Sequence, residues 1–499
     1  MLFVATLKKD GADRLSAKKS IKKNYIYNLS YQILTLITPL VTTPYLSRVF
    51  GADGIGTYSY VESISSYFVL FATLGLTTFG QREISYVQEN RKERSIIFWE
   101  TNIIELIAST LCIAIYVVFS FMQVNRNMYL VLVLNLLSVV FNISWFFQGM
   151  EEFGKIVFRD ILFKFVNIIY IFAFVKTKND VIVYLFGMSF FSLIYNISYW
   201  IAIDKYIDMP VLKDLHPARH VKTVASLFVP TIAIQVYTVL DKTMIGIITQ
   251  NPFEVGYYEQ TLKISKLVLT IVTSLSLVMI PRIGYHYGRG DTESVKKYMY
   301  RSYRFVWFCG IPLTFGLIAI SKNFVPWFFG YGYDKVIPLL GILSFLILAI
   351  GINNVTGMQY LIPTKRENIY TMTVIVGAAT NFMLNMILIK SFQSIGASIA
   401  SVVAELMIAI TQIYIVRKEL SPFEILKCST HYFIAGGIMF VTLLAIRNNF
   451  EASFIHTFIL VILGATIYFV ALFVMHDEFL LSNTGTILKK IIVKLNGEE

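Results

Sequence analysis

Residues 38–59 read TPLVTTPYLSRVFGADGIGTYS, and this stretch decides the fold. It lies within a long apolar run, yet it contains Pro39, Pro44 and Arg48 and passes through a glycine-rich turn that begins at Gly51. Proline interrupts the helical hydrogen-bond ladder, and a charge inside a bilayer is costly. Such residues are tolerated where helices line a wet cavity and not lipid. The stretch therefore predicts two apolar helices hinged near Gly51, and it makes transport the first functional hypothesis.

The composition places the whole chain in a membrane. Of its 499 residues, 56% are hydrophobic and 15% are charged, and the mean hydropathy is +0.64. Soluble domains carry about 25% charged residues. We therefore predict an all-α integral membrane protein. The three cysteines are far apart in apolar surroundings, so we expect core thiols and no disulfide.

Apolar segments of about 20 residues, the length that crosses a bilayer, occur about fourteen times along the chain. We expect two six-helix bundles in a pseudo-twofold arrangement, followed by two extra helices. The predicted parts are a cytoplasmic N-terminal segment at 1–23, bundles at 24–203 and 223–416, a cytoplasmic linker at 204–222, two additional helices in 417–475 and a cytoplasmic tail at 476–499. Apolar residues at helical spacing in that tail predict an amphipathic helix on the inner membrane surface, with disorder as the alternative.

Lysine and arginine are concentrated in alternate loops, which fixes the expected orientation. Cytoplasmic loops carry the excess of these residues, so we expect a multi-pass membrane protein with both termini in the cytoplasm. This topology signal accounts for most of the formal net charge of +12. The basic loop at 281–302 should lie against anionic headgroups of the lipid bilayer. A nucleic-acid partner is therefore not expected.

An internal repeat appears when the chain is shifted by 200 residues. The matched identities are Gly56 with Gly256, Tyr58 with Tyr258, Ile64 with Ile264, Ser65 with Ser265, Thr73 with Thr273 and Arg82 with Arg282. The two copies are separated by six predicted spans, so they have the same orientation. Parallel repeats of this kind are a known transporter plan.

Polar residues recur on one face of several predicted spans, including Asn381 and Asn385 in the eleventh. The structural alternative for any single stripe is hydrogen bonding between helices. Buried cations that face a shared cavity would suit a phosphate-bearing cargo. The candidate cations are Arg48, Lys164, Lys242, Lys263 and Lys266.

Two of these cations have a local acid at i,i+4 spacing, as in Asp160–Lys164 and Glu259–Lys263, and each pair can neutralise itself on one helix. Arg48, Lys242 and Lys266 have no such partner on their own helix face. For Arg48 and Lys242 the alternative is that each side chain extends to the membrane interface from near a helix end.

Signatures of an enzyme or a cofactor site are missing from the sequence. It has no G-x-x-x-x-G-K-[ST] loop for ATP, no H-E-x-x-H motif, and no Cys/His constellation for a metal. His216 and His220 are four residues apart, but Pro217 lies between them. We therefore expect no enzymatic activity, no cofactor, no catalytic residues and no metal site.

Four stretches together resemble Wzx-type polysaccharide flippases, which transport O-antigen or capsule repeat units. This family belongs to the multidrug/oligosaccharidyl-lipid/polysaccharide exporter superfamily. The resemblance extends over essentially the whole chain, and the stretches are 38–59, LGLTTFGQRE at 74–83, WFFQGME at 145–151 and LDKTMIG at 240–246.

The resemblance implies an undecaprenyl-pyrophosphate-linked oligosaccharide as cargo, flipped by alternating access across the cytoplasmic membrane. It also implies a cationic cavity, which Arg48, Lys242, Lys263 and Lys266 fit, and drive by an ion gradient or by downstream consumption. The candidate ion-linked carboxylates are Asp241, Glu62 and Glu405, with structural pairing as the alternative. A polysaccharide polymerase and other assembly proteins are possible partners.

Three rival functions stay open. A drug or metabolite antiporter of the same superfamily should favour carboxylates that bind cationic drugs. In this chain the buried lysines are at least as numerous as the buried acids. A membrane-embedded polysaccharide polymerase usually needs a large outer loop, and the predicted outer loops are short. A structural scaffold leaves the charged helix faces unexplained.

Overall fold

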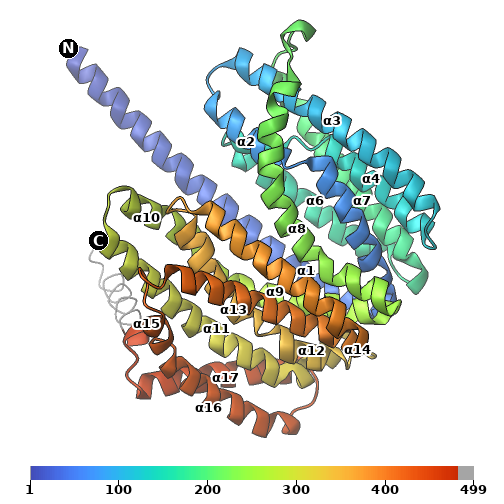
Figure 1. Cartoon of the computed structure of the whole chain (residues 1–499), viewed down its shortest axis with the longest axis vertical. Coiled ribbons are helices and arrows are strands. Elements are labelled where there is room, and N and C mark those ends of the chain that lie inside the picture. Colours follow the sequence, from blue (N-terminus) through green and yellow to red (C-terminus); the bar gives the residue numbers. More distant parts are fainter. Residues whose placement is uncertain (1, 482–499) are drawn as a thin grey trace. The chain divides into compact units, whose positions relative to one another are not determined.

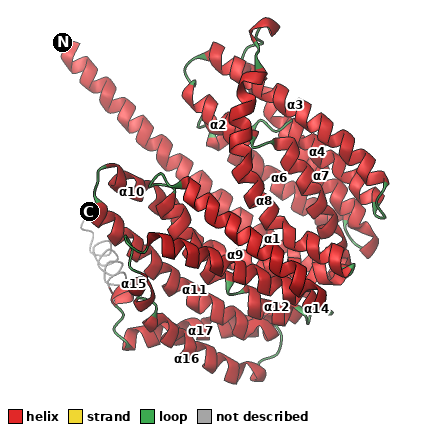
Figure 2. Ribbon diagram, in the orientation of Figure 1, coloured by secondary structure: helices red, strands yellow, loops and turns green. Residues whose placement is uncertain are grey.

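The computed structural model describes the backbone of residues 2–481, and it describes side chains from residue 34 onward apart from a few positions between 153 and 277. Within residues 2–481 every regular element is a helix and no strand is present (Figure 2). This is the expected solution for an apolar chain, because a helix satisfies its backbone hydrogen bonds internally. The all-α prediction is confirmed. The predicted surface helix within the tail lies largely outside the described residues.

The first helix, α1 (Leu2–Thr73), contains the hinge that the sequence predicted. Gly51 has φ 69° and ψ 175°, a conformation outside the helical region. A Cβ atom there would lie 2.8 Å from Asp53 Oδ1. Only glycine occupies this backbone region readily, which explains the residue at the bend. The predicted N-terminal segment 1–23 continues into the same helix from Leu2 onward.

The helices cluster into two compact units. The N-terminal unit consists of the chain up to Gly54 together with Tyr58–Val239, and the C-terminal unit consists of Ile55–Thr57 together with the chain from Leu240 onward. The boundary at Val239 and Leu240 lies inside helix α8 (Val221–Thr249), the expected seventh span. The predicted linker 204–222 belongs to the N-terminal unit.

In the N-terminal unit, neighbouring helices pack side by side: α3 on α4, α4 on α7, and α6 on α7 (Figure 1). Its helices after α1 are α2 (Leu76–Tyr86), α3 (Arg91–Phe121), α4 (Arg126–Val140), α5 (Ser144–Gly149), α6 (Phe153–Phe174) and α7 (Val181–Ser198), with short turns η1 (Lys178–Asp180), η2 (Tyr199–Lys205), η3 (Leu212–Asp214) and η4 (Pro217–His220).

Two of the motif stretches pack on each other in this unit. Helix α2 lies against α5, and a Cβ on Gly80 would lie 2.4 Å from the Trp145 ring. Only a glycine leaves room for that indole. Trp145 is fully buried in an aromatic cluster with Phe98, Phe146 and Phe147. The two stretches therefore form one packing unit, which the linear sequence does not reveal.

In the C-terminal unit, α16 and α17 pack against α11, so the two extra helices join this unit. A π-helix, η5, continues α13, and α14 has a non-helical residue at Gln393 with φ 53°. The elements are α9 (Pro252–Thr273), α10 (Ser276–Gly288), α11 (Thr292–Phe329), α12 (Val336–Leu343), α13 (Leu346–Asn353), η5 (Asn354–Leu361), α14 (Glu367–Val416), α15 (Pro422–Lys427), α16 (Thr430–Ile446), η6 (Arg447–Asn449) and α17 (Phe454–Val474).

The helix breaks follow the 200-residue repeat. α1 ends at Thr73 and α9 ends at Thr273, and a short break then precedes α2 at Leu76 and α10 at Ser276. The repeat found in the sequence is therefore also a repeat in the positions of the helix ends.

Nine helices within the described residues are long and apolar enough to cross a membrane, and a bent pair, α9 with α10, raises this number to ten. Two of the nine are much longer than one span. One runs from Leu34 to Tyr86 across the Gly51 hinge, and the other is α14, with its break at Gln393. A helix of 50 residues extends about 75 Å, and the hydrocarbon core is about 30 Å thick, so each has the length for two passes. The number fourteen stays a prediction.

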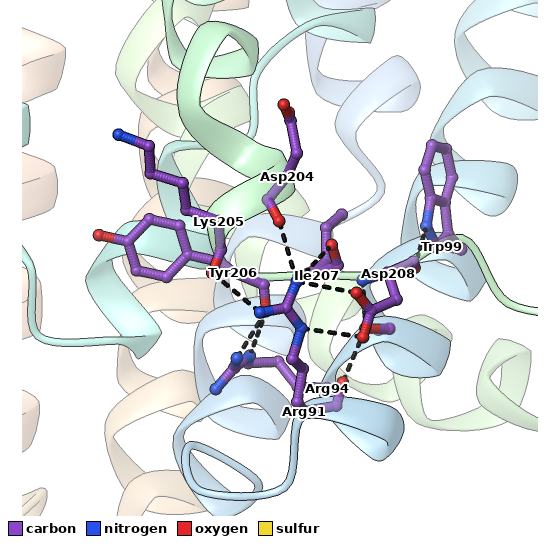
Figure 3. A network of polar contacts seen from close by, with 9 residues as sticks. Arg91, Arg94, Trp99, Asp204, Lys205, Tyr206, Ile207 and Asp208 are labelled. Carbon is purple, nitrogen blue, oxygen red and sulfur yellow. Dashed lines mark hydrogen bonds and ion pairs between the residues drawn. The ribbon is translucent and has the colours of Figure 1, made fainter.

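The linker segment is held along the N-terminal end of α3 by a dense polar network (Figure 3). The Arg91 guanidinium contacts the Asp208 carboxylate at 2.8 Å, and Arg94 Nε donates to the Tyr206 carbonyl at 3.0 Å. Trp99 Nε1 donates to the Asp208 carbonyl at 3.2 Å. Because the segment has few apolar residues to bury, these hydrogen bonds fix its path instead.

Candidate functional site

Among the described residues, a group of buried or partly buried charges lies in the C-terminal unit, where α8 meets α9. Lys242 Nζ lies 3.0 Å from Glu259 Oε2, and Lys263 Nζ lies 3.4 Å from Glu259 Oε1. Glu259 is the shared carboxylate, and its side chain is 12% exposed. The i,i+4 pair predicted for Glu259 and Lys263 is confirmed. Lys242, which lacks an acid on its own helix face, has its partner on the neighbouring helix.

Lys266 follows Lys263 by three residues and therefore lies on the same side of α9. Its side chain is exposed, and it has no hydrogen bond or ion pair with any residue that the structure describes. Lys242 and Lys263 thus share one acid, while Lys266 has an ammonium group open to an incoming anion.

Asp241, next to Lys242 on α8, is buried and enclosed by hydrogen-bond donors. Its Oδ1 accepts from Asn381 Nδ2 at 3.0 Å and from Asn385 Nδ2 at 2.6 Å. Its Oδ2 accepts from Ser401 Oγ at 2.7 Å and from the Tyr258 hydroxyl. All four donors are neutral, and such donors stabilise a charged carboxylate in a buried place. The Asn385 Oδ1 atom is buried in the described part of the chain without a hydrogen-bond partner.

Glu405 lies on α14, one helical turn after Ser401, and is also buried. Asn353 donates from Nδ2 to the Glu405 backbone carbonyl at 3.0 Å and also to its carboxylate. Asn353 is the last residue of α13, directly before the π-helix η5. Such π-helical insertions are rare and frequently occur at functional sites.

The other three candidates belong to the N-terminal unit and are described separately. Arg48 lies on α1 just before the hinge and is exposed, and Glu62 lies after the hinge and is partly buried. Lys164 on α6 lies 3.5 Å from Asp160, which confirms the predicted i,i+4 pair, and its Nζ donates to Thr35 Oγ1 at 2.6 Å.

The structure thus places Asp241, Lys242, Lys263, Lys266 and Glu405 in one unit. The sequence interpretation missed three residues that bond to them: Tyr258, Ser401 and Asn353. For two of these residues the sequence contained a partial indication. Tyr258 is one of the repeat identities, and Ser401 precedes Glu405 by one turn of helix. What the linear sequence lacks is the pairing of α8, α9 and α14 around Asp241.

This arrangement can do two kinds of chemistry. The oxygen atoms of Asp241, Ser401, Tyr258 and the two asparagine amides are hard donors of the kind that bind a proton or a small hard cation. The lysines of α8 and α9 are donors suited to phosphate oxygens. No cluster of three or more His, Cys, Asp or Glu side chains that would hold a metal ion occurs among the described residues.

An all-helical chain with apolar spans, buried carboxylates and lysines, and a parallel repeat defines a multi-pass membrane protein of the transporter class. Solved structures support this fold. The chain is similar to the lipid II flippase MurJ in its inward closed conformation, with a TM-score of 0.69, 17% identity and coverage of 91% of this chain and 99% of the other. A multidrug resistance MATE family transporter in the inward-facing conformation gives a TM-score of 0.60 and 14% identity, covering 79% of this chain and 99% of the other.

The chain belongs to the family described as "Polysaccharide biosynthesis protein", whose model matches residues 21–285. A second model, MatE, matches residues 227–388. A putative O-antigen transporter of Escherichia coli (strain K12) is 23% identical, covering 81% of this chain and 98% of the relative. A putative O-antigen transporter of Shigella dysenteriae is 20% identical, covering 78% of this chain and 98% of the relative. A probable low-salt glycan biosynthesis flippase of Haloferax volcanii is 21% identical over 46% of this chain and 49% of its own length.

Proposed function

We propose that this protein is a flippase that moves undecaprenyl-pyrophosphate-linked oligosaccharide repeat units across the bacterial cytoplasmic membrane. The product would supply surface polysaccharide, such as O-antigen or capsule, to a polymerase on the outer side. Two observations support the proposal: membership of the polysaccharide biosynthesis family, and relatives named as O-antigen transporters that this chain matches over 98% of their length.

The single observation that carries the mechanism is the lysine group of α8 and α9. Lys242 and Lys263 share Glu259, and Lys266 presents an ammonium group without a bonded partner among the described residues. A pyrophosphate can bind Lys266 first and then compete with Glu259 for the other two lysines. Release of the cargo restores the original ion pairs, so the two lysines have an anionic partner both before and after transport.

Asp241 is the candidate coupling residue. Protonation or cation binding at this carboxylate would neutralise a charge that now depends on four neutral donors. Asn381 and Asn385 can turn their amide oxygens towards a bound cation, and the Asn385 oxygen has no partner to lose among the described residues. Glu405, one turn along α14 from Ser401, is a second candidate. Alternating access driven by an ion gradient follows from such a site.

The N-terminal unit contains further candidate residues for cargo binding and for ion coupling. Arg48, beside the hinge of α1, is proposed to bind cargo phosphate or sugar. Lys164 has a local acid and a hydroxyl acceptor, which makes it a weaker anion ligand. Glu62 is proposed as an ion-linked carboxylate after the hinge.

A drug or metabolite antiporter is the second candidate function, because the MatE model matches residues 227–388. The buried charges distinguish the two functions. A cationic drug requires an acid without a bonded cation, whereas Glu259 is already shared by two lysines. Drug export that depends on Asp241 in the purified protein would favour the antiporter.

Deletion of the gene tests the proposed function directly. We expect lipid-linked repeat units to accumulate on the inner leaflet and surface polymer to disappear, with both effects reversed by the intact gene. The leaflet is assigned by access of the glycan to a membrane-impermeant glycosidase or lectin. Glycan that still reaches the outer leaflet in the deletion strain would contradict the proposal.

Thiol labelling tests the proposed orientation, with both termini in the cytoplasm. Lys178→Cys and Lys213→Cys, each in a chain whose three native cysteines are changed to serine, place single thiols at exposed positions. We expect an impermeant maleimide to label Cys at 178 from outside intact cells, and Cys at 213 only after the membrane is opened. Labelling of both from the same side would contradict the orientation.

A further inference from the structure

The N-terminal unit contains an apolar groove that the proposed transport mechanism does not use. Its volume is about 650 Å³, and it is formed by the end of α1, by α3, by η4 and by the first turns of α8. Phe71, Ile107 and Leu111 line it, and their side chains are 49%, 65% and 61% exposed. No charged residue lines this groove within the described part of the chain.

Cations stand at the cytoplasmic end of the groove. The α3 face that carries Ile104 and Ile107 begins at Glu100, which is fully buried. Arg219 donates to Glu100 Oε2 from Nη2 at 2.6 Å and from Nε at 3.1 Å, and His220 Nε2 lies 2.7 Å from the same oxygen. These bonds hold η4 at the mouth of the groove.

Two donor groups at this mouth are available to a ligand. Arg219 Nη1 makes no hydrogen bond to any described residue, and the Arg219 side chain is 51% exposed. Lys222 follows the lining residue Val221, is exposed, and has no bonded partner among the described residues.

The length of the groove corresponds to one leaflet of a bilayer. Glu100 and Leu111 are eleven steps apart on one continuous α-helix, which rises about 16 Å between them. The hydrocarbon core of a bilayer is about 30 Å thick, so one leaflet measures about 15 Å. An acyl chain that starts at the level of Glu100 would therefore end near Leu111. A prenyl chain of fifty-five carbons is longer than this groove.

We propose that this groove binds an anionic glycerophospholipid of the inner leaflet, with one acyl chain along α3 and its phosphate at Arg219 and Lys222. Basic sites between membrane helices on the cytoplasmic side recognise lipid headgroups by the same physical chemistry. The lipid would stabilise the junction of α3 with the linker. There Arg91 of α3 bonds to Asp208 of the linker (Figure 3), and Arg219 of the linker bonds to Glu100 of α3. This inference does not depend on the proposed cargo.

The chain provides its own probe and its own control. Cys112 lines this groove, and Cys309 lines a second apolar groove of about 380 Å³ formed by α9, α11, α16 and α17. The arginines near that second groove have bonded partners: Arg304 lies 3.9 Å from Glu478, and Arg447 donates to the Ala319 carbonyl. Two versions of the full-length protein, each with the other two cysteines changed to serine, therefore compare a groove that has a lysine without a bonded partner at its mouth with a groove whose nearby arginines are bonded.

The experiment measures quenching of a bimane label by brominated lipids in reconstituted vesicles. The vesicles contain phosphatidylcholine with a small, varied fraction of brominated phosphatidylglycerol or of brominated phosphatidylcholine. At Cys112 we expect half-maximal quenching at a several-fold lower fraction of the brominated phosphatidylglycerol. At Cys309 the two brominated lipids should quench equally.

Lys222→Gln breaks no bond in the structure and should reduce the preference at Cys112 by up to about fivefold, the effect of one cation near a membrane surface. Arg219→Gln should reduce it further, with thermal unfolding measured alongside because Glu100 loses a partner. Equal quenching by both lipids at Cys112, or no change in either variant, would overturn the proposal. Relief of quenching by undecaprenyl phosphate would assign the groove to the cargo instead and would likewise overturn it.

Discussion

The two copies of the repeat share a backbone and differ in chemistry. After the hinge, α1 runs to Thr73, and 200 residues later α9 runs to Thr273. Tyr58 and Tyr258 are both buried, at 2% and 0% exposure. The matched helix ends and the matched tyrosines indicate that the same local packing is used twice.

The charged residues of α9 have uncharged counterparts in α1. Glu259, Lys263 and Lys266 correspond at the 200-residue offset to serines at 59, 63 and 66. Ser63 donates to the Tyr60 carbonyl on its own helix, whereas Glu259 is bonded to a lysine on the neighbouring helix. A repeat can thus be kept by apolar packing while the charged group around Glu259 occurs in one copy. This difference is the reason why we propose the main anion and ion sites in the second copy.

The largest expected effect comes from Glu259→Gln. Removing this charge leaves Lys242 and Lys263 without their shared acid, and removing one partner of a buried ion pair costs about 3–5 kcal/mol. We expect a large fall in the unfolding temperature of the detergent-solubilised protein, together with loss of transport.

The matched control is Ser59→Ala. Ser59 Oγ is buried without a hydrogen-bond partner among the described residues, so its removal should cost less than about 1 kcal/mol. Equal losses at both positions would remove the distinction between the two copies.

Asp241→Asn should separate coupling from folding. The amide keeps the shape of the side chain and removes the charge that a coupling ion would neutralise. We expect ion-driven transport in proteoliposomes to fall on the order of 5- to 150-fold, the range of typical coupling energies. A sodium gradient and a proton gradient are applied separately to identify the ion. Val41→Asn, at the matching position of the first copy, is the control. Unchanged dependence on both gradients in Asp241→Asn would exclude this residue as the coupling site.

The hinge residues offer a test of backbone conformation in the two copies. Gly51 has φ 69° with extended ψ, and Gln250, at the start of the second copy, has φ 50°. Gly51→Ala forces a side chain into a region open almost only to glycine and should cost about 1–3 kcal/mol. Gln250→Gly relieves a left-handed non-glycine residue and should stabilise by about 1 kcal/mol. Thermal unfolding of both variants checks the opposite signs. Destabilisation by Gln250→Gly would mean that the amide side chain has a role beyond the turn.

Sequence reasoning could predict the features that depend on local pattern. Helices, the hinge at Gly51 and the pairs Glu259–Lys263 and Asp160–Lys164 follow from hydropathy, from glycine and from i,i+4 spacing. It could not predict which helices meet. The Lys242–Glu259 pair joins two helices, and the enclosure of Asp241 joins three, so neither has a signature at a fixed spacing.

Helix ends were also harder to predict than helices. The chain passes through Gln393 without leaving the helix for more than one residue, so two predicted spans form the single helix α14. The boundary between the two units falls within α8, although the charged segment 204–222 is the obvious linker by composition. Arginines on α3 bind that segment to the N-terminal unit, and nothing in its own composition indicates this.

Lys266→Ala should reduce transport without reducing stability. The side chain is exposed and has no bonded partner among the described residues, so its loss should change the free energy of unfolding by less than about 0.5 kcal/mol. A lysine that binds pyrophosphate should nevertheless raise the cargo concentration needed for half-maximal transport. Ser66→Ala, at the matching position of α1, should change neither quantity. A transport defect that is equal in both variants would contradict a special role for the second copy.

The smallest expected effect concerns the turns that follow α2 and α10. Asn90 caps α3 by accepting from the Glu93 backbone N–H, and Asp291 caps α11 by accepting from the Ser294 backbone N–H at 3.0 Å. That backbone bond, the Ser294 hydroxyl and His286 lower the pKa of Asp291 to about 2. A carboxyl whose pKa is lowered on folding stabilises the fold above its unfolded pKa of about 4 and loses that effect as the pH falls towards 2.

Only the stability that the charged cap contributes should therefore depend on pH. We expect the unfolding temperature of wild-type protein to fall between pH 4 and pH 2 slightly more than that of Asp291→Asn, in which the cap stays neutral and bonded. Asn90→Asp should add a similar acid dependence to the first copy. Because Asp291 is solvent-exposed, high salt should weaken its effect. If Asp291→Asn and wild type lose stability in parallel over this range, the Asp291 carboxylate contributes nothing that a neutral cap does not, and the two turns are equivalent.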